Sequence, residues 1–127
     1  MMVTTLVDQP ARLVRFTVSG TVETPEMLAA LDDALRQLEP GVQYIVLSDH
    51  RELVRAVTPE QIRVLMDALA RRGQALRGCR FGVVVSTDAS YGMMRLMAVH
   101  AEAIGIQVGV FRKLEEAMAF VAKSATP

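Results

Sequence analysis

The sequence has little cysteine, few aromatic residues, no tryptophan and no excess of either charge. The single cysteine, Cys79, excludes an intramolecular disulfide and a zinc site built from several cysteines of one chain. Such a composition fits a reducing compartment, and we expect the protein in the cytoplasm.

The charge balance also limits the classes of partner. Fourteen Lys and Arg residues offset 14 Asp and Glu residues, and only two Tyr and four Phe residues are present. A neutral chain has no field to attract nucleic acid, and so few aromatic rings form no base-stacking platform. We expect no nucleic-acid partner. Because 51% of the residues are hydrophobic and little charge repulsion opposes association, we expect that the chain can form a homodimer.

Long apolar runs and ligand-binding motifs are missing too. The N-terminal segment has no basic stretch followed by a long apolar run, so we expect neither a signal peptide nor a membrane span. The glycines lack the spacing of a phosphate-binding loop, and two histidines without a cysteine array predict no metal site. We therefore expect no cofactor.

Residues 81–97 organise the rest of the chain. An uninterrupted apolar strand, Phe81 to Val85, leads through a polar turn into a methionine-rich amphipathic helix. A strand without polar alternation is typical of a parallel sheet covered on both faces, and we predict it as the central strand. Ser90 and Asp88 are candidate caps of the helix.

The spacing in that helix predicts which methionines are buried. Met93 and Met97 share one face, which we expect to pack on the sheet. Met94 lies about 100° away from Met93 around the helix, so we predict it on a partner-facing surface.

The remaining elements alternate along the chain. Two β-branched runs joined through Pro10 predict an antiparallel hairpin at residues 3–19, and the strand at Val42–Leu47 ends in a charged turn at residues 48–52. The order β, β, α, β, α, β, α, β, α predicts an α/β fold with four helices, whose mixed sheet combines the hairpin with parallel βα units. We expect a single domain over residues 1–127, with a loose tail at 123–127.

Two segments sharpen a resemblance to a known family. YIVLSDHRELVRAVTPEQI at residues 44–62 is similar to a family strand, Asp-containing turn and helix start, and GVFRKLEEAMAFV at residues 109–121 is similar to a family ending. Together with the element order, they resemble the STAS and SpoIIAA-like superfamily, whose best-known members are anti-sigma-factor antagonists. The resemblance implies a SpoIIAA-like fold and a non-enzymatic regulatory module that binds a protein partner in sigma-factor or stress signalling.

The resemblance also points to a modification site. Classical members carry a phosphorylatable Ser at the start of the second helix, and aligning the family Asp with Asp49 places Thr58 there. Thr58 can equally form a capping box with Gln61, and the Asp-Ser-Ser-Gly-like motif of the family is absent. Phosphoacceptor and helix cap both stay open for Thr58, and Ser48 is a second acceptor candidate.

Polar clusters follow three predicted parallel strands, and their carboxyl ends form the edge where α/β sheets bind ligands. We predict a partner- or ligand-binding rim at this edge. Its residues are Asp49, His50, Thr58, Asp88, Ser90, Tyr91, Met94 and Arg112.

Two other functions compete with protein interaction. The SpoIIAA-like fold resembles the CRAL-TRIO lipid-transfer domain, so the methionine-rich helix could border an apolar pocket for a small molecule or lipid. A hydrolase would use Ser86 or Ser90 as nucleophile, His50 as base and Asp49 or Asp88 to orient it. No Gly-x-Ser-x-Gly motif is present, and adjacent residues in a turn point apart, so we expect no enzyme.

Overall fold

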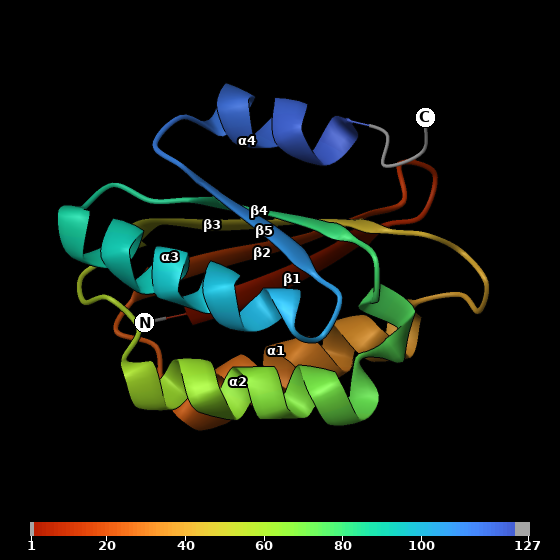
Figure 1. Ribbon diagram of the computed structural model, residues 1–127, viewed down its shortest axis with the longest axis horizontal. Coiled ribbons are helices and arrows are strands. Elements are labelled where there is room, and N and C mark those ends of the chain that lie inside the picture. Colours follow the sequence, from red (N-terminus) through yellow and green to blue (C-terminus); the bar gives the residue numbers. More distant parts are fainter. Residues whose placement is uncertain (1, 124–127) are drawn as a thin grey trace.

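The computed structural model describes residues 2–123 and contains a five-stranded sheet with helices on both faces (Figure 1). The elements in chain order are β1 (Met2–Asp8), β2 (Leu13–Gly20), α1 (Thr24–Gln37), β3 (Ile45–Leu53), α2 (Pro59–Arg72), the 3-10 turn η1 (Gln74–Leu76), β4 (Arg80–Val84), α3 (Asp88–Glu102), β5 (Gln107–Phe111) and α4 (Leu114–Ala122). The predicted order of strands and helices is confirmed. Apart from Lys123, the predicted tail at 123–127 lies outside the described residues.

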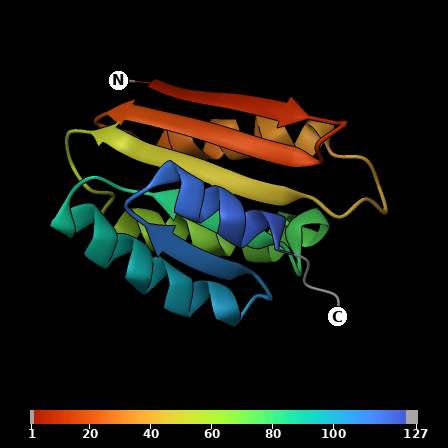
Figure 2. The same cartoon turned by 90° about the horizontal axis from the view of Figure 1, so that it is seen from above.

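The sheet has the strand order β1-β2-β3-β4-β5. β1 and β2 are antiparallel, and every later pair is parallel, which confirms the predicted mixed sheet. Each right-handed crossover moves one strand in the same direction, so α1, α2 and α3 cover one face. α4 lies on the other face, over the β3–β5 side, and leaves β1 and β2 uncovered there (Figures 1 and 2).

The apolar strand that we predicted to be central is β4, and its central position is wrong because β3 occupies the middle of the sheet. Its burial on both faces is confirmed. Phe81 and Val83 belong to the main core beneath α1, α2 and α3, whereas Val84 packs with Ala117 of α4. An unbroken apolar run therefore indicates that helices cover both faces of a strand. It does not indicate that the strand is the middle one of the sheet.

β3 extends well beyond the predicted strand at Val42–Leu47. Residues 48–52, predicted as a turn, continue the strand, because β2 pairs with β3 from Leu13↔Ile45 to Gly20↔Leu53 across one register shift. β2 thus offers backbone hydrogen-bond partners to residues 48–52, and the pattern of side chains in the sequence does not reveal this pairing. This extension moves Ser48, Asp49 and His50 from a loop into the sheet.

Close packing of α4 requires a glycine in β4. A Cβ at Gly82 would lie 2.9 Å from Cγ1 of Val121 and 3.2 Å from the carbonyl oxygen of Ala117. We expect Gly82→Val to displace α4 and lower the free energy of unfolding by about 1–3 kcal/mol in urea denaturation. The control is Gly92→Ala in α3, which has open space around the added methyl group and should gain up to about 1 kcal/mol. A Gly82→Val protein as stable as the wild type would contradict this packing.

Candidate functional site

β3 sorts its polar side chains onto opposite faces of the sheet. Successive residues of a strand point to opposite sides, so Ser48 and His50 face α1, α2 and α3, whereas Asp49 and Arg51 face the side of α4. The expectation that Asp49 and His50 point apart is confirmed. The predicted rim is therefore divided between a buried site and a separate ionic cluster.

Two arginines hold the Asp49 carboxylate. Arg51 donates from Nε to Oδ1 at 2.9 Å and from Nη2 to Oδ2 at 2.7 Å, and Nη2 of Arg15 lies 3.8 Å from Oδ2. The hydrogen bond from the Arg51 side chain holds the pKa of Asp49 below its usual value, despite partial desolvation. Asp49 is thus an ionised partner of arginine and does not orient His50, as one version of the alternative hydrolase arrangement would require.

Ser48 and His50 form a buried polar pair. Oγ of Ser48 lies 2.8 Å from Nε2 of His50, and the two residues are only 4% and 8% exposed. Burial lowers the pKa of His50 to about 4, although the nearby Asp49 charge acts in the opposite direction. His50 is therefore neutral at pH 7. Among residues 2–123, Nδ1 of His50 has no hydrogen-bond partner.

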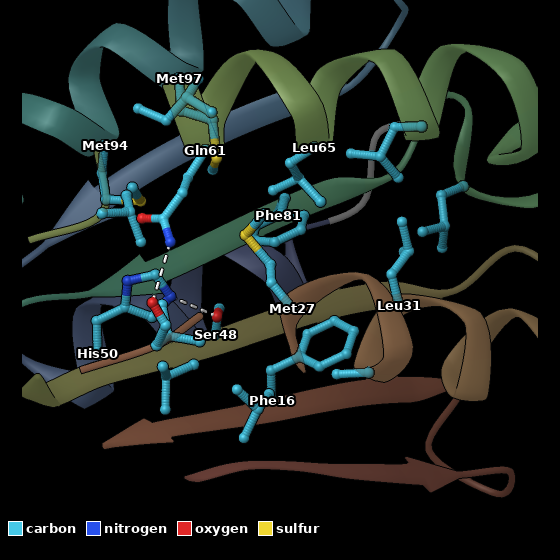
Figure 3. A pocket seen from close by; sticks show the side chains of 18 residues that line it. Phe16, Met27, Leu31, Ser48, His50, Gln61, Leu65, Phe81, Met94 and Met97 are labelled. Atoms are coloured by element: carbon cyan, nitrogen blue, oxygen red, sulfur yellow. Dashed lines mark hydrogen bonds between the residues drawn. The ribbon is translucent and has the colours of Figure 1, made fainter. Parts of the chain in front are cut away.

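The pair lies at a cavity of about 80 Å³ between the sheet and helices α1, α2 and α3 (Figure 3). Almost all of its lining is apolar, and the three polar side chains are Ser48, His50 and Gln61. The labelled apolar side chains around it are Phe16, Met27, Leu31, Leu65, Phe81, Met94 and Met97. Such a mainly apolar space with a few polar groups on one side is typical of small-molecule sites.

Gln61 connects this cavity to the start of α2. Its Nε2 donates to the Val22 carbonyl at 3.0 Å, and its Oε1 accepts from the Thr58 backbone N–H at 3.0 Å. Thr58 Oγ1 accepts in turn from the Gln61 backbone N–H at 3.1 Å, which confirms the predicted capping box. Thr58 is exposed, so it marks the outer end of a short polar link to the cavity.

Three other predicted rim residues come together at the outer edge. Nη2 of Arg112 donates to Oδ1 of Asp88 at 2.6 Å, and the Arg112 guanidinium lies 5.0 Å from the centre of the Tyr91 ring. Ser90, by contrast, is buried. The N-cap of α3 is Thr87, whose Oγ1 accepts a hydrogen bond from the Ser90 backbone N–H, so neither predicted cap, Ser90 or Asp88, is the N-cap. The rim and the cavity are thus separate places.

The predicted partner-facing position of Met94 is wrong. Met94 is 1% exposed and lines the cavity, whereas Met93 is half-buried. The buried stripe of α3 is Ser90, Met94, Met97 and Ala101, which follow one another at the spacing of a single helix face. Met97 is buried as predicted.

Sequence reasoning missed Ser48 as the partner of His50 and Gln61 as a cavity residue. The contact between Ser48 and His50 could have been predicted if residues 48–51 had been interpreted as a strand, because Ser48 and His50 would then share one face and Asp49 and Arg51 the other. No sequence signal places Gln61 there, because its neighbours in the cavity come from distant segments.

No known family model matches this sequence, and no curated protein matches it. A solved structure does resemble it: an uncharacterised protein of the DUF3478 family from Shewanella loihica PV-4, described as having a SpoIIAA-like fold. The two share 14% sequence identity with a TM-score of 0.61, over 94% of this chain and 92% of the other. The fold is SpoIIAA-like.

The SpoIIAA-like fold fixes the architecture and leaves the chemistry to the side chains described above. Within residues 2–123, none of the helices has the length and apolar character needed to cross a bilayer. The same residues contain no group of three or more His, Cys, Asp or Glu side chains placed to hold a metal ion. The buried Ser48–His50 pair, which borders the mainly apolar cavity, is the strongest candidate site.

Burial of neutral His50 predicts acid sensitivity. The pKa of His50 is 6.5 when unperturbed and about 4 in the fold, so the unfolded chain binds the proton first. The free energy of unfolding should fall as pH drops from 6.5 toward about 4, by up to about 1.4 kcal/mol per pH unit. Urea denaturation across this range measures the slope.

A Ser48→Ala/His50→Phe double variant is the control for that slope. It removes both members of the buried pair and should lose the dependence in this window. Asp49 does not account for this slope, because its pKa is lowered from 3.8, so its stabilising contribution is present above that pH and is lost as the pH falls below it. An equal slope in the variant and the wild type would contradict the assignment to His50.

Proposed function

We propose that this chain is a non-enzymatic regulatory module that binds a small, uncharged and mainly apolar molecule in the cavity between its sheet and helices. The observation that carries the proposal is a mainly apolar, partly open space bordered by the buried Ser48–His50 pair, in which Nδ1 of His50 has no hydrogen-bond partner among residues 2–123. Buried polar atoms are nearly always hydrogen-bonded, and an exception calls for a missing partner.

The energetics favour an occupant. An empty cavity of about 80 Å³ costs about 2 kcal/mol at the rate found for apolar cores. An unsatisfied buried polar atom costs about 1–3 kcal/mol more. A molecule that fills the space recovers the first term.

The lining sets the kind of molecule. No Asp, Glu, Lys or Arg lines the cavity, so a charged ligand would lose its hydration without gaining a counter-charge. Met27, Met94 and Met97 are unbranched and can adjust their side chains to different shapes. At about 80 Å³ the space suits a few non-hydrogen atoms, since an apolar cavity of about 150 Å³ admits benzene.

The route into the cavity passes between α1 and α2. Met27 of α1 and Gln61 and Leu65 of α2 are half-buried lining residues, whereas Met94 and Met97 of α3 are fully buried. Small separations of α1 and α2 therefore give access without disturbing the sheet.

A titration with methylenecyclobutane tests the cavity directly. We expect the methyl NMR signals of Met27, Met94 and Met97 to shift, whereas Met118 on α4 stays unchanged, because it lies on the opposite face of the sheet. This prediction uses an uncharged hydrocarbon, so a response reports burial in an apolar space.

Two alanines of α1 provide matched variants. Ala30 lines the cavity and Ala29 is exposed. Ala30→Leu should fill the space and weaken hydrocarbon binding at least about tenfold, whereas Ala29→Leu should leave it unchanged. Equal binding by the two variants would contradict a ligand site in this cavity.

A second candidate function is the protein-interaction role that the family resemblance implies, and β1 is the observation that favours it. Among the described residues, the outer edge of β1 pairs with no strand, and its stretch from Met2 to Val7 carries no charge, proline or bulge. Edge strands without such features pair readily with another chain. Met2 and Leu6 are 56% and 59% exposed on the face that α4 leaves open.

A second copy of this chain fits that edge. Antiparallel pairing of two β1 strands about a two-fold axis at Thr4 would place Met2 of one copy opposite Leu6 of the other. Thr58, exposed at the start of α2, is the phosphoacceptor proposed for such a regulatory module, because a phosphate at a helix N-terminus meets backbone N–H groups and the positive end of the helix dipole.

The oligomeric state in solution tests the second candidate. Light scattering should give twice the chain mass for the wild type, whereas Leu6→Lys should give the monomer mass, because it places a charged side chain opposite the apolar Met2 of the other copy. Val99→Lys, on an exposed position of α3, should remain a dimer. A wild-type monomer at high protein concentration would rule out this interface.

A further inference from the structure

The residues of α1 and α2 that line the cavity differ in their exposure along the two helices. Met27 of α1 and Leu65 of α2 are half-buried, and both lie in the first half of their helices. Leu31 and Leu69, one turn further along, are each only 4% exposed. The opening of the cavity is therefore near the N-terminal ends of α1 and α2.

Gln61 spans this opening. It is the third residue of α2, and its Nε2 donates a hydrogen bond of 3.0 Å to the carbonyl oxygen of Val22, two residues before α1 begins. The dashed line from Gln61 in Figure 3 marks this bond. Both residues line the cavity, and Val22 is buried whereas Gln61 is half-buried. The bond thus joins the start of α2 to the segment before α1.

The carbonyl oxygen of the same side chain has a separate partner. Oε1 of Gln61 accepts from the Thr58 backbone N–H at 3.0 Å, as part of the capping box of α2. The two atoms of one amide therefore have different tasks, since Oε1 caps the helix and Nε2 bonds across the opening. Loss of the Val22 bond alone would separate the two segments and leave the cap of α2 in place.

We propose that the Gln61–Val22 hydrogen bond is a latch, so that a small apolar molecule enters and leaves the cavity only while this bond is open. This inference rests on the proposed ligand-binding function and adds the residue that controls access. A latch that closes equally over the empty and the occupied cavity changes the rates of association and dissociation by the same factor. It leaves the dissociation constant unchanged, because it does not favour either state.

A second contact between the two helices lies away from the opening. Nε of Arg72, at the end of α2, donates to Oδ1 of Asp32 in α1 at 2.8 Å, and these side chains are 43% and 41% exposed. The pair lies near Leu31 and Leu69, at the closed end of the cavity. Exposed ion pairs contribute little to stability. Asp32 therefore provides a control for general loosening of α1 against α2.

A charge-neutral exchange of two side chains removes the latch and retains the cap. Gln61→Glu still accepts from the Thr58 N–H, as glutamate does in many capping boxes, but it has no N–H to donate to Val22. Glu60 is the exposed neighbour in the same helical turn, so adding Glu60→Gln keeps the charge of that turn constant. The test variant is Glu60→Gln/Gln61→Glu, and the matched controls are Glu60→Gln and Asp32→Asn.

NMR line shapes and relaxation dispersion of the Met27, Met94 and Met97 methyl groups, titrated with methylenecyclobutane, give the exchange rates and the dissociation constant. We expect Glu60→Gln/Gln61→Glu to raise the association and dissociation rates by the same factor, about threefold to tenfold, because one hydrogen bond no longer closes the opening. The dissociation constant should change by less than about twofold. Both control variants should exchange at the wild-type rate.

The outcomes separate the latch from the ligand-binding function. Unchanged rates in Glu60→Gln/Gln61→Glu, or equal acceleration by Asp32→Asn, overturn the latch and leave the binding function standing. Faster dissociation with unchanged association also overturns it, because Gln61 would then contribute to affinity rather than to access. Absence of methylenecyclobutane binding to the wild type overturns both inferences.

The wild-type protein gives a second readout that needs no folded variant. Relaxation dispersion of the Gln61 side-chain amide nitrogen in the presence of methylenecyclobutane measures how often the bond to Val22 opens. The latch requires that this opening be at least as fast as dissociation of the hydrocarbon. Dissociation faster than the opening of the bond would overturn the proposal.

Discussion

The alternation of side chains along β3 is the constraint on which the candidate site depends. Successive side chains of a strand point to opposite faces of the sheet, so the four consecutive polar residues 48–51 lie in two different environments. Asp49 and Arg51 pair on the face of α4, where charge is partly hydrated. Ser48 and His50 enter the main core, where only an uncharged pair is tolerated. A shift of one residue in the register of β3 would bury the ion pair and expose the imidazole.

The cavity follows from the way the helices cover this face. α1, α2 and α3 all pack on the same side because each crossover advances by one strand, and the space between them is lined by methionine, leucine and phenylalanine side chains. Flexible methionines from α1 and α3 line this space together with the polar pair. The fold thus combines a buried polar pair with an adaptable apolar wall.

Much of the fold could be predicted from local patterns. The hairpin around Pro10, the capping box of Thr58 and Gln61, and the apolar strand before the methionine-rich helix each depend on neighbouring residues. The site depended on long-range pairing instead. β3 continues through polar residues because β2 lies beside it, and Met94 shares the buried face of α3 with Ser90, Met97 and Ala101. These shifts of a few residues moved His50 and Met94 from a predicted rim into a cavity.

A crystal structure of the protein soaked with methylenecyclobutane tests the central claim most directly. The account predicts the hydrocarbon in the cavity between β3 and helices α1, α2 and α3, in contact with Met27, Met94 and Met97. A cavity left without hydrocarbon at saturating concentration, or hydrocarbon bound only elsewhere, would contradict the account.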